Sequence, residues 1–380
     1  MINLDKPGLY IHVPFCGSKC VYCDFYSVTD SSLIPDWLEG IKREAGLYSR
    51  RFEAFDTLYV GGGTPSHLSN DTLTALFDRL FNCFDIIPGA EITIEANPDD
   101  ITEEKLGHFK ELGINRISLG VQSFDDQDLV FLKRRHTAGQ AMDALKQIKL
   151  KSRTFDLSLD LIFGLPGQTE KKWKKSLEKA LSYTPEHVSC YQLTYEKGTL
   201  LSNMKDQGLI RPCEEDRAAN LFLTSSRLLE DHGYVHYEVS NFAFGDMNRS
   251  RHNQKYWRHT PYLGLGPSAH SYKDGERWWN YNSIETYCQV LDSNKLPVED
   301  KERLAREQLD LEAVFLGLRT REGFDLKILG EGSILDEKLL KLEELGLIVT
   351  QNGRVVPTKK GFLVADNLPL QLLKHQGRSN

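Results

Sequence analysis

The sequence lacks the features that mark membrane-spanning, secreted and nucleic-acid-binding proteins. No stretch reaches the roughly 20 uninterrupted apolar residues that a transmembrane helix needs. The segment Met1 to Gly8 contains no apolar signal core. The formal net charge of −7 is the opposite of the basic surplus that nucleic-acid-binding domains usually carry. We therefore expect a soluble, cytoplasmic protein without a nucleic-acid partner.

Cysteine is scarce and unevenly distributed. The 380 residues include seven cysteines, and an odd number without a secretion signal argues against a disulfide framework. Four of them lie far apart and are interpreted as small buried thiols. Cys16, Cys20 and Cys23 instead fall within eight residues of sequence. This group is the first candidate for chemistry.

Apolar, β-branched runs alternate with segments of helical periodicity in the first part of the chain. The predicted strands are Leu9 to Phe15, Thr57 to Gly61, Glu91 to Glu95, Arg116 to Val121, Leu157 to Phe163 and Val188 to Leu193. Several of the helical segments open with a capping residue, namely Asn70, Thr102 or Thr169. Six such units predict an α/β fold whose parallel sheet curls towards a barrel. The loops after the strands would then meet at one face.

The pattern changes twice in the last third of the chain. An aromatic-rich, loop-like segment follows the barrel, and beyond it come two helical runs and two short strands around Asn352 and Gly353, a strong hairpin signal. This order resembles a small winged-helix-like α+β module. DNA binding by it is not favoured, because Leu335 to Val349 carries no surplus of bases over acids. The expected parts are residues 1–245 as the barrel, residues 246–300 as the connecting segment and residues 301–380 as the winged-helix-like domain.

The three clustered cysteines have the spacing C-x3-C-x2-C and directly follow the first predicted strand. A tight loop with this spacing can direct three thiolates at one metal centre. Iron–sulfur clusters usually take four cysteines, so three leave one iron with an open coordination position. The alternatives are a zinc site of the Cys3His type that uses His12, or three unrelated core cysteines.

Further motifs in a fixed order make the chain resemble the radical S-adenosylmethionine (SAM) superfamily. They are the cysteine loop, Gly61-Gly62-Gly63-Thr64-Pro65, Glu95 in Ile-Glu-Ala-Asn-Pro, Gln122 in Gly-Val-Gln-Ser-Phe, and Asp160 in Asp-Leu-Ile-Phe-Gly-Leu-Pro-Gly. The resemblance implies a partial (β/α)6 barrel and a 4Fe-4S cluster on the three cysteines. It also implies that SAM chelates the open iron and is cleaved reductively to a 5'-deoxyadenosyl radical.

The resemblance further implies which residues contact SAM. Gly62, Gly63 and Thr64 match the loop that takes the SAM amino group, where a missing Cβ lets the backbone approach a ligand. Glu95 suits a ribose hydroxyl or the ammonium. The remaining expected contacts are Tyr10, Tyr22, Gln122, Arg134 and Asp160. Ordinary barrel packing and salt bridges are the alternative for these residues, although a buried Asp160 in an apolar strand would be costly without a partner.

Two positions distinguish branches of the superfamily. Oxygen-independent coproporphyrinogen dehydrogenases carry another cysteine two residues beyond the third, where this chain has Phe25. Haem chaperones of the HemW type have phenylalanine there and a His-Asn-x-x-Tyr-Trp signature, present here from His252 to Trp257. The resemblance therefore implies a protein of porphyrin metabolism that binds haem and delivers it to acceptors such as respiratory enzymes. Oxidative decarboxylation of coproporphyrinogen III is the alternative, which Phe25 puts in doubt.

His252 is the predicted haem ligand, because an imidazole can bind haem iron and the adjacent aromatics offer a flat apolar surface. His270 and His136 remain rival ligands. Haem-accepting proteins are the expected partners. A homodimer formed on haem binding and a peripheral membrane contact are both compatible with this function.

Overall fold

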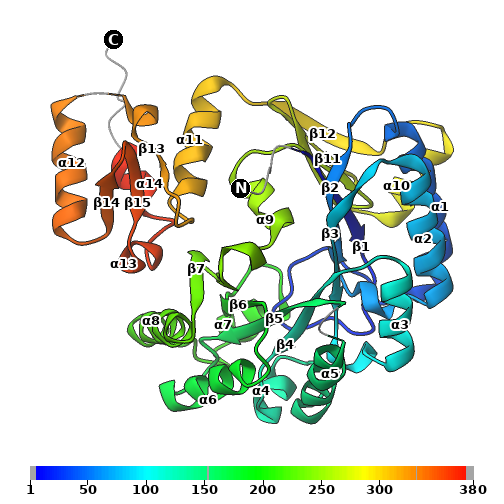
Figure 1. Cartoon of the computed structure of the whole chain (residues 1–380), viewed down its shortest axis with the longest axis horizontal. Helices are drawn as coiled ribbons and strands as arrows, with labels where there is room; N and C mark the ends of the chain where they lie inside the picture. Colours follow the sequence, from blue (N-terminus) through cyan, green and yellow to red (C-terminus); the bar gives the residue numbers. More distant parts are fainter. Residues whose placement is uncertain (1–5, 152–153, 331, 374–380) are drawn as a thin grey trace.

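Six parallel strands form the centre of the molecule. The computed structural model describes residues 6–151, 154–330 and 332–373. The six strands pair in chain order, as predicted (Figure 1). Their bounds are β1 Gly8–Val13, β2 Phe55–Gly62, β3 Ile86–Ala96, β4 Arg116–Gln122, β5 Asp156–Phe163 and β6 His187–Gln192. The predicted α/β class is confirmed.

The connecting helices bury one apolar stripe each against the sheet. Leu73 and Leu76 of α2, and Trp173 and Leu177 of α6, are fully buried in this way. Burial of whole side chains of this kind is the main force that holds such layers together. The helices are α1 Ile34–Tyr48, α2 Asn70–Cys83, α3 Glu103–Glu111, α4 Asp126–Phe131, α5 Ala138–Leu150, α6 Glu170–Leu181, α7 Leu200–Asp206 and α8 Glu215–Asp231.

Side-chain caps fix where several helices begin. Thr102 and Thr169 cap α3 and α6, as predicted. The prediction for α2 was wrong by one residue, since the cap is Ser69 and not Asn70. The side-chain oxygen of Ser69 accepts a hydrogen bond from the backbone N–H of Thr72 at 3.2 Å.

Alternate residues of β1 point to opposite faces of the sheet. Leu9, Ile11 and Val13 are fully buried in the core beneath the helices. Tyr10 and His12 therefore face the barrel interior. This alternation brings polar side chains to the inner face of an otherwise apolar layer.

The segment expected to be loop-like adds four strands and two helices instead. After the hairpin of β7 Tyr234–Glu238 and β8 Asn241–Phe244 come α9 Arg251–Trp257, β9 Tyr262–Leu265, β10 His270–Lys273, β11 Glu276–Asn280, α10 Ile284–Asp292 and β12 Val298–Arg303. β9 pairs in parallel with β1, and β10 to β12 continue the sheet antiparallel. Strands of four or five residues are too short to show a period in sequence. The loop prediction for residues 246–300 is therefore wrong.

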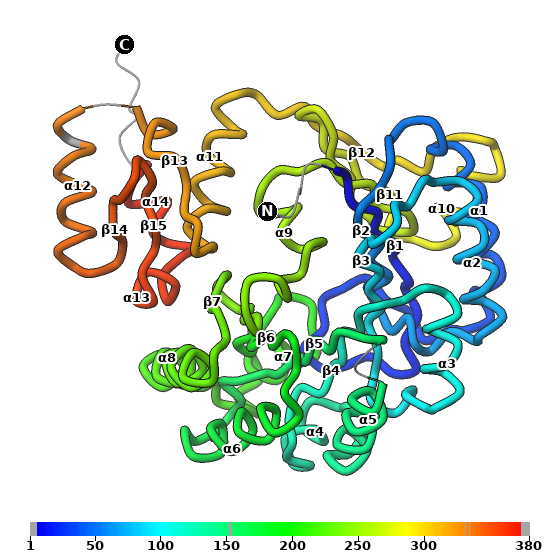
Figure 2. The backbone as a smooth tube through the Cα atoms, in the orientation of Figure 1, coloured from blue at the N-terminus to red at the C-terminus, as the bar shows by residue number. Residues whose placement is uncertain are grey.

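The C-terminal elements form a separate three-stranded sheet with its own core. They are α11 Arg306–Gly317, β13 Phe324–Asp325, α12 Ser333–Glu344, β14 Ile348–Gln351, β15 Arg354–Pro357, α13 Lys359–Phe362 and α14 Leu368–Leu373. Asn352 and Gly353, with φ of 52° and 73°, form the predicted turn between β14 and β15. Figure 2 shows this unit on the side of the molecule where β7 and α8 lie. The exact domain limits stay a prediction.

None of the helices within the described ranges is long and apolar enough to cross a membrane.

Candidate functional site

The loop after β1 carries all three clustered cysteines and is fastened at both ends. The backbone N–H of Cys16 donates to the carbonyl of Val28 at 3.0 Å, and that of Val28 donates to Pro14 at 2.7 Å. Cys16 is buried, whereas Cys20 and Cys23 are half-buried, and all three are free thiols. The loop therefore presents three thiols at the C-terminal end of the barrel strands.

The three thiols are close enough to affect one another electrostatically. Burial raises the pKa of Cys16, and it raises the pKa of Cys23 to about 11, with a smaller contribution from the neighbouring cysteines. The Arg134 guanidinium lies 3.3 Å from the sulfur of Cys20. Without a metal the thiols of Cys16 and Cys23 hold their protons at neutral pH, so a metal centre must displace these protons.

A single-ion site does not fit this loop. Among residues 6–151, 154–330 and 332–373, no three His, Cys, Asp or Glu side chains are grouped as the ligands of one metal ion. Both ring nitrogens of His12 are already engaged, with the hydroxyl of Tyr10 at 3.0 Å and the carbonyl of Tyr26 at 2.9 Å. A zinc site that uses His12 is therefore disfavoured. An iron–sulfur cluster spreads its thiolates over several irons, so it does not require three side chains grouped around one ion.

The glycine loop after β2 lies directly against the cysteine loop. The backbone N–H groups of Gly63 and Thr64 donate to carbonyls of Val13 and Phe15, at 2.7 and 2.8 Å. A Cβ on Gly63 would lie 2.7 Å from the Phe15 oxygen, and Gly62 has a φ of +110°. Only glycine fits both positions. The two predicted motifs are thus one structural unit.

Two carboxylate side chains, those of Glu95 and Asp160, lie in the barrel interior. Glu95 accepts hydrogen bonds from the hydroxyl of Tyr59 at 2.8 Å and from the N–H of Gly62 at 3.0 Å. Asp160 accepts from Ser118 at 3.0 Å through one oxygen, while its other oxygen has no partner. Burial raises the pKa of Glu95 to about 7 and that of Asp160 to about 6. A buried carboxylate oxygen without a partner is suited to a polar ligand.

Three further predicted SAM residues, Arg134, Gln122 and Tyr22, gather at the same end of the barrel. The ring of Tyr10 lies deeper, beside Tyr59 and His252. Arg134 bonds to the carbonyl of Gly120 at 2.9 Å and to the side chain of Asn97, and its Nε has no partner. Gln122 ends β4 with a φ of 63°, an unusual conformation for a residue other than glycine. Tyr22 lies beside Arg134 and Cys20, and burial raises its pKa. Gln122 and Arg134 flank Gly120, and Arg134 and Tyr22 lie beside Cys20, so these groups are close to one another near the cysteine loop.

His252 lies at the opposite end of the barrel. Its ring is 1% exposed, and its nitrogens contact the hydroxyls of Thr57 at 2.8 Å and Tyr256 at 2.9 Å. Thr57 is near the start of β2, whereas Gly62 ends that strand. Burial lowers the pKa of His252 to about 3, so the ring is neutral. This geometry argues against the predicted ligation of haem iron by His252.

The rest of the signature segment fastens α9 to the start of the barrel strands. Lys255 is 0% exposed and its Nζ lies 2.6 Å from a carboxylate oxygen of Asp56. The N–H of His252 donates to Glu91 at 2.9 Å. Sequence reasoning missed Asp56 and Glu91, since their partners lie more than 150 residues away along the chain.

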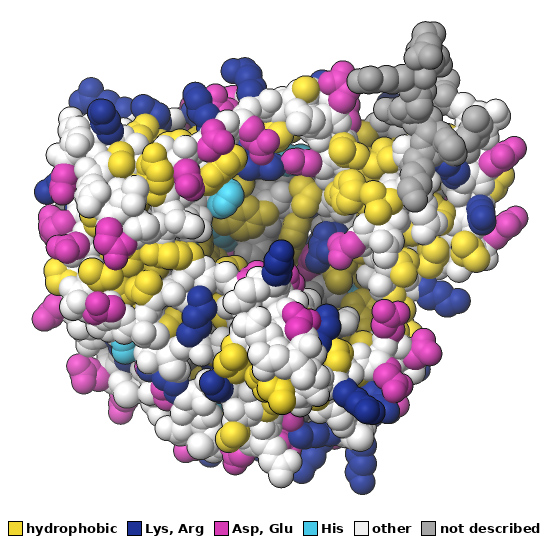
Figure 3. Space-filling view, turned by 180° about the vertical axis from the view of Figure 1, so that it is seen from behind, with side chains coloured by type: hydrophobic (Ala, Val, Ile, Leu, Met, Phe, Trp, Pro, Cys, Tyr) yellow, Lys and Arg dark blue, Asp and Glu magenta, His cyan; other side chains and the backbone are white. Residues whose placement is uncertain are grey.

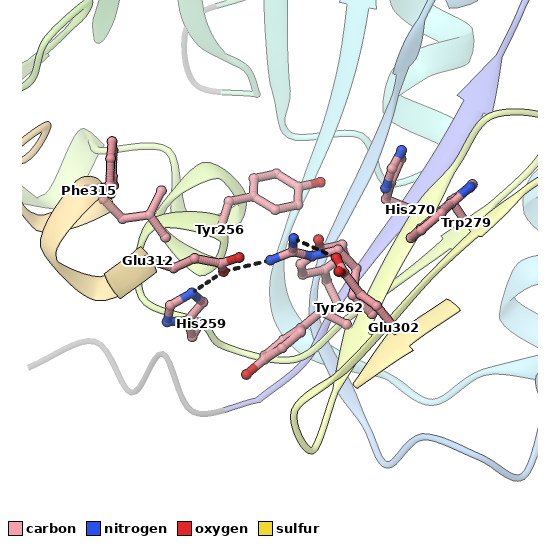
Figure 4. A pocket seen from close by; sticks show the side chains of 11 residues that line it. Tyr256, His259, Tyr262, His270, Trp279, Glu302, Glu312 and Phe315 are labelled. Atoms are coloured by element: carbon pink, nitrogen blue, oxygen red, sulfur yellow. Dashed lines mark hydrogen bonds and ion pairs between the residues drawn. The ribbon is translucent and has the colours of Figure 1, made fainter. Parts of the chain in front are cut away.

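A cavity of about 450 Å³ lies between the added strands and α11 (Figure 4). The face opposite to that of Figure 1 is hollowed between the barrel and the C-terminal unit (Figure 3). The residues that line the cavity are Tyr256, His259, Tyr262, His270, Tyr272, Arg277, Trp279, Glu302, Glu312, Phe315 and Leu316. Apart from His270 and Tyr256, sequence reasoning did not single out these residues as a site.

Comparison with known proteins matches both parts of the chain. A model of the radical SAM superfamily matches residues 10–180, and one of the HemN C-terminal domain matches residues 304–364. The haem chaperone HemW of Mycobacterium tuberculosis is 35% identical over 372 residues, which span 96% of this chain and 94% of the relative. The chain belongs to the HemW family of radical SAM proteins. The HemW of Lactococcus lactis is 34% identical and spans 96% of this chain and 97% of the relative.

Among solved structures, coproporphyrinogen III oxidase (HemN) of Escherichia coli, a radical SAM enzyme, superposes with a TM-score of 0.82. It is 22% identical, and the match covers 97% of this chain and 90% of that one, which confirms the fold. As radical SAM proteins, members of the HemW family use a 4Fe-4S cluster and SAM, which confirms two of the three predicted cofactors.

Proposed function

We propose that this chain is a haem chaperone that binds haem and delivers it to acceptor haemoproteins such as respiratory enzymes. The observation that carries the proposal is its similarity to HemW chaperones over nearly the whole length of both chains. Phe25 supports the same choice, because its side chain is 63% exposed beside the cysteine loop and supplies no further thiol. Coproporphyrinogen dehydrogenase activity is accordingly expected to be absent.

Within this function, Cys16, Cys20 and Cys23 hold the cluster. When bound, the cluster supplies the electron that cleaves the sulfonium bond of SAM. The Arg134 guanidinium stabilises the negative charge of the thiolates, since it lies 3.3 Å from Cys20. The partner-free oxygen of Asp160 is available to a donor group of SAM.

Further SAM contacts follow from the same arrangement. The absence of a Cβ at Gly62 and Gly63 leaves room beside Thr64 for the amino acid part of SAM. Glu95 lies next to this loop, through its bond to the N–H of Gly62. Tyr10, Tyr22 and Gln122 complete the proposed set of contacts.

The proposed setting is the cytoplasm, with a homodimer formed on haem binding and a peripheral membrane contact where acceptors reside. The acidic charge of −7 supports the absence of a nucleic-acid partner. Light scattering with and without hemin measures the predicted dimer. The proposed division of labour places the cluster and SAM in residues 1–245 and leaves residues 301–380 as a cover or docking face.

A transfer assay tests the chaperone function. Protein with its cluster intact is loaded with hemin and mixed either with an apo-cytochrome b or with a haem scavenger. We expect faster transfer to the acceptor than to the scavenger, because delivery requires contact between the two proteins. Equal rates, or no hemin uptake, would contradict the proposal. Anaerobic incubation with SAM and coproporphyrinogen III should yield no protoporphyrinogen.

A further inference from the structure

We propose that haem occupies the cavity between β9 to β11 and α11, with His270 as its axial ligand. This inference rests on the proposed function and names the site where haem is held. The cavity of about 450 Å³ falls within the range of about 300–1,000 Å³ that is usual for ligand pockets.

The walls of the cavity suit a flat aromatic ligand. Tyr262 and Tyr272 stand side by side on β9 and β10, with ring centroids 6.2 Å apart and planes 30° apart. Phe315 and Leu316 of α11 add apolar side chains to the lining of the same cavity. A macrocycle among these side chains would bury apolar surface.

His270 is the histidine best placed to bind iron there. It begins β10, lines the cavity and stacks on Trp279, with ring centroids 5.7 Å apart (Figure 4). In the part of the chain that the structure describes, neither of its ring nitrogens has a hydrogen-bond partner. Burial lowers its pKa, with a smaller contribution from Arg277, so the ring is neutral at pH 7. Neutral imidazole is the form that ligates haem iron.

The other candidate histidines are engaged or do not line the cavity. Both nitrogens of His252 are bonded, as described above. His136 is 2% exposed and its Nε2 contacts the carbonyl of Val121 at 3.0 Å; its Nδ1 has no partner, but His136 is not among the residues that line the cavity. His259 lines the same cavity, but its Nε2 lies 3.0 Å from the carboxylate of Glu312. His270 alone among these four reaches the cavity with a free ring.

The charged groups at the cavity can accommodate a propionate. Arg277 is held by Glu312 at 2.7 Å and by Glu302 at 3.2 Å. Glu312 would keep His259 as a partner if Arg277 turned towards a propionate. A guanidinium can bind a carboxylate through two parallel hydrogen bonds.

A chain of side-chain contacts also connects the cavity with the predicted SAM site. Tyr256 lines the cavity and bonds to His252, whose ring stacks on Tyr59 at 5.1 Å. Tyr59 in turn donates to Glu95. The signature segment therefore lies between the proposed haem site and the predicted SAM site, which gives it a role without iron ligation.

Hemin titration under anaerobic conditions, followed by the Soret band, tests the site in the full chain with its cluster. We expect His270→Ala to weaken hemin binding by at least about tenfold and to change the Soret spectrum, and imidazole to restore the spectrum. His232→Ala is the matched control, because His232 is an exposed histidine at the end of α8. Leu316→Trp, which fills the cavity and keeps His270, should also block binding.

The outcomes separate the two proposals. If the unaltered chain takes up no hemin, the chaperone function fails. If it binds hemin and His270→Ala binds with the same affinity and spectrum, only the site is wrong. A variant that loses affinity but keeps the original spectrum overturns the assignment of His270 as ligand. Unchanged hemin binding by Leu316→Trp would show that haem does not occupy the cavity. If only His252→Ala loses the spectrum of ligated haem while it stays folded, the axial ligand is His252 of the signature segment and not His270.

Discussion

Replacement of Lys255 by methionine tests whether the signature segment anchors the barrel. Lys255 is 0% exposed and Asp56 is 1% exposed, and their charged atoms lie 2.6 Å apart. The Nζ of Lys255 also donates to the carbonyl of Lys6 at 2.7 Å. Methionine keeps most of the apolar stem, so the change removes mainly the charge and the donor.

The magnitude follows from what the substitution leaves behind. Removal of one partner of a buried ion pair costs about 3–5 kcal/mol, because the other charge stays buried. Asp56 would keep Arg251, whose guanidinium lies 3.2 Å away and is partly exposed. We therefore expect the lower end of the range, a loss of about 3 kcal/mol in the free energy of unfolding.

Chemical denaturation of the full-length variants, followed by circular dichroism, measures this loss. Lys42→Met is the control, because its pair with Glu39 at 2.7 Å is exposed to solvent. Exposed pairs contribute about 0–1 kcal/mol. A loss for Lys255→Met no larger than for Lys42→Met would refute the anchoring role.

Three further substitutions address the cores and the SAM site. Burial raises the pKa of Glu44 from 4.5 to about 7, so the folded chain binds more protons than the unfolded chain in this window. Stability must then fall as pH rises from about 4.5 to 7, and Glu44→Gln should flatten this dependence in melting curves at pH 5 and 8. Gly63→Ala should impair cluster and SAM binding, because its Cβ would lie 2.7 Å from a backbone oxygen, whereas Gly107→Ala meets no atom within 4 Å and should be neutral or stabilising. Asp160→Asn should weaken SAM binding by about tenfold or more without loss of fold stability, since it removes a buried charge with a free oxygen.

Each of these predictions has a contrary result. Equal pH slopes for Glu44→Gln and the parent would mean that Glu44 does not titrate in this window. Equal iron content and SAM affinity for the two glycine variants would show that the loop tolerates a Cβ. Unchanged SAM affinity in Asp160→Asn, measured by calorimetry, would remove Asp160 from the site.

The barrel could be predicted because its information is local. A buried parallel strand such as Leu157 to Phe163 is rich in large apolar residues, and caps such as Thr102 and Thr169 mark helix starts within four residues. The cysteine loop is equally local, since all three thiols lie within eight residues. A cap at Ser69 or at Asn70 is indistinguishable in sequence, because both side chains suit the position.

The added strands and the role of His252 could not be predicted in the same way. β9 joins the sheet because Gly8 pairs with Tyr262, a contact between distant parts of the chain that leaves no periodic pattern. The Nδ1 of His252 contacts the hydroxyl of Thr57, which lies 195 residues away along the chain. The cavity around His270 exists only because α11 packs over the strands. Contacts of this kind depend on tertiary structure.

The central claim is that three cysteines hold a cluster with one iron open to SAM. Anaerobic reconstitution, followed by iron and sulfide analysis and by electron paramagnetic resonance of the reduced protein with and without SAM, tests it most directly. We predict about four irons and four sulfides per chain, and a signal that changes when SAM is added. A preparation that binds neither iron nor sulfide, or a cluster signal that SAM leaves unaltered, would contradict the claim.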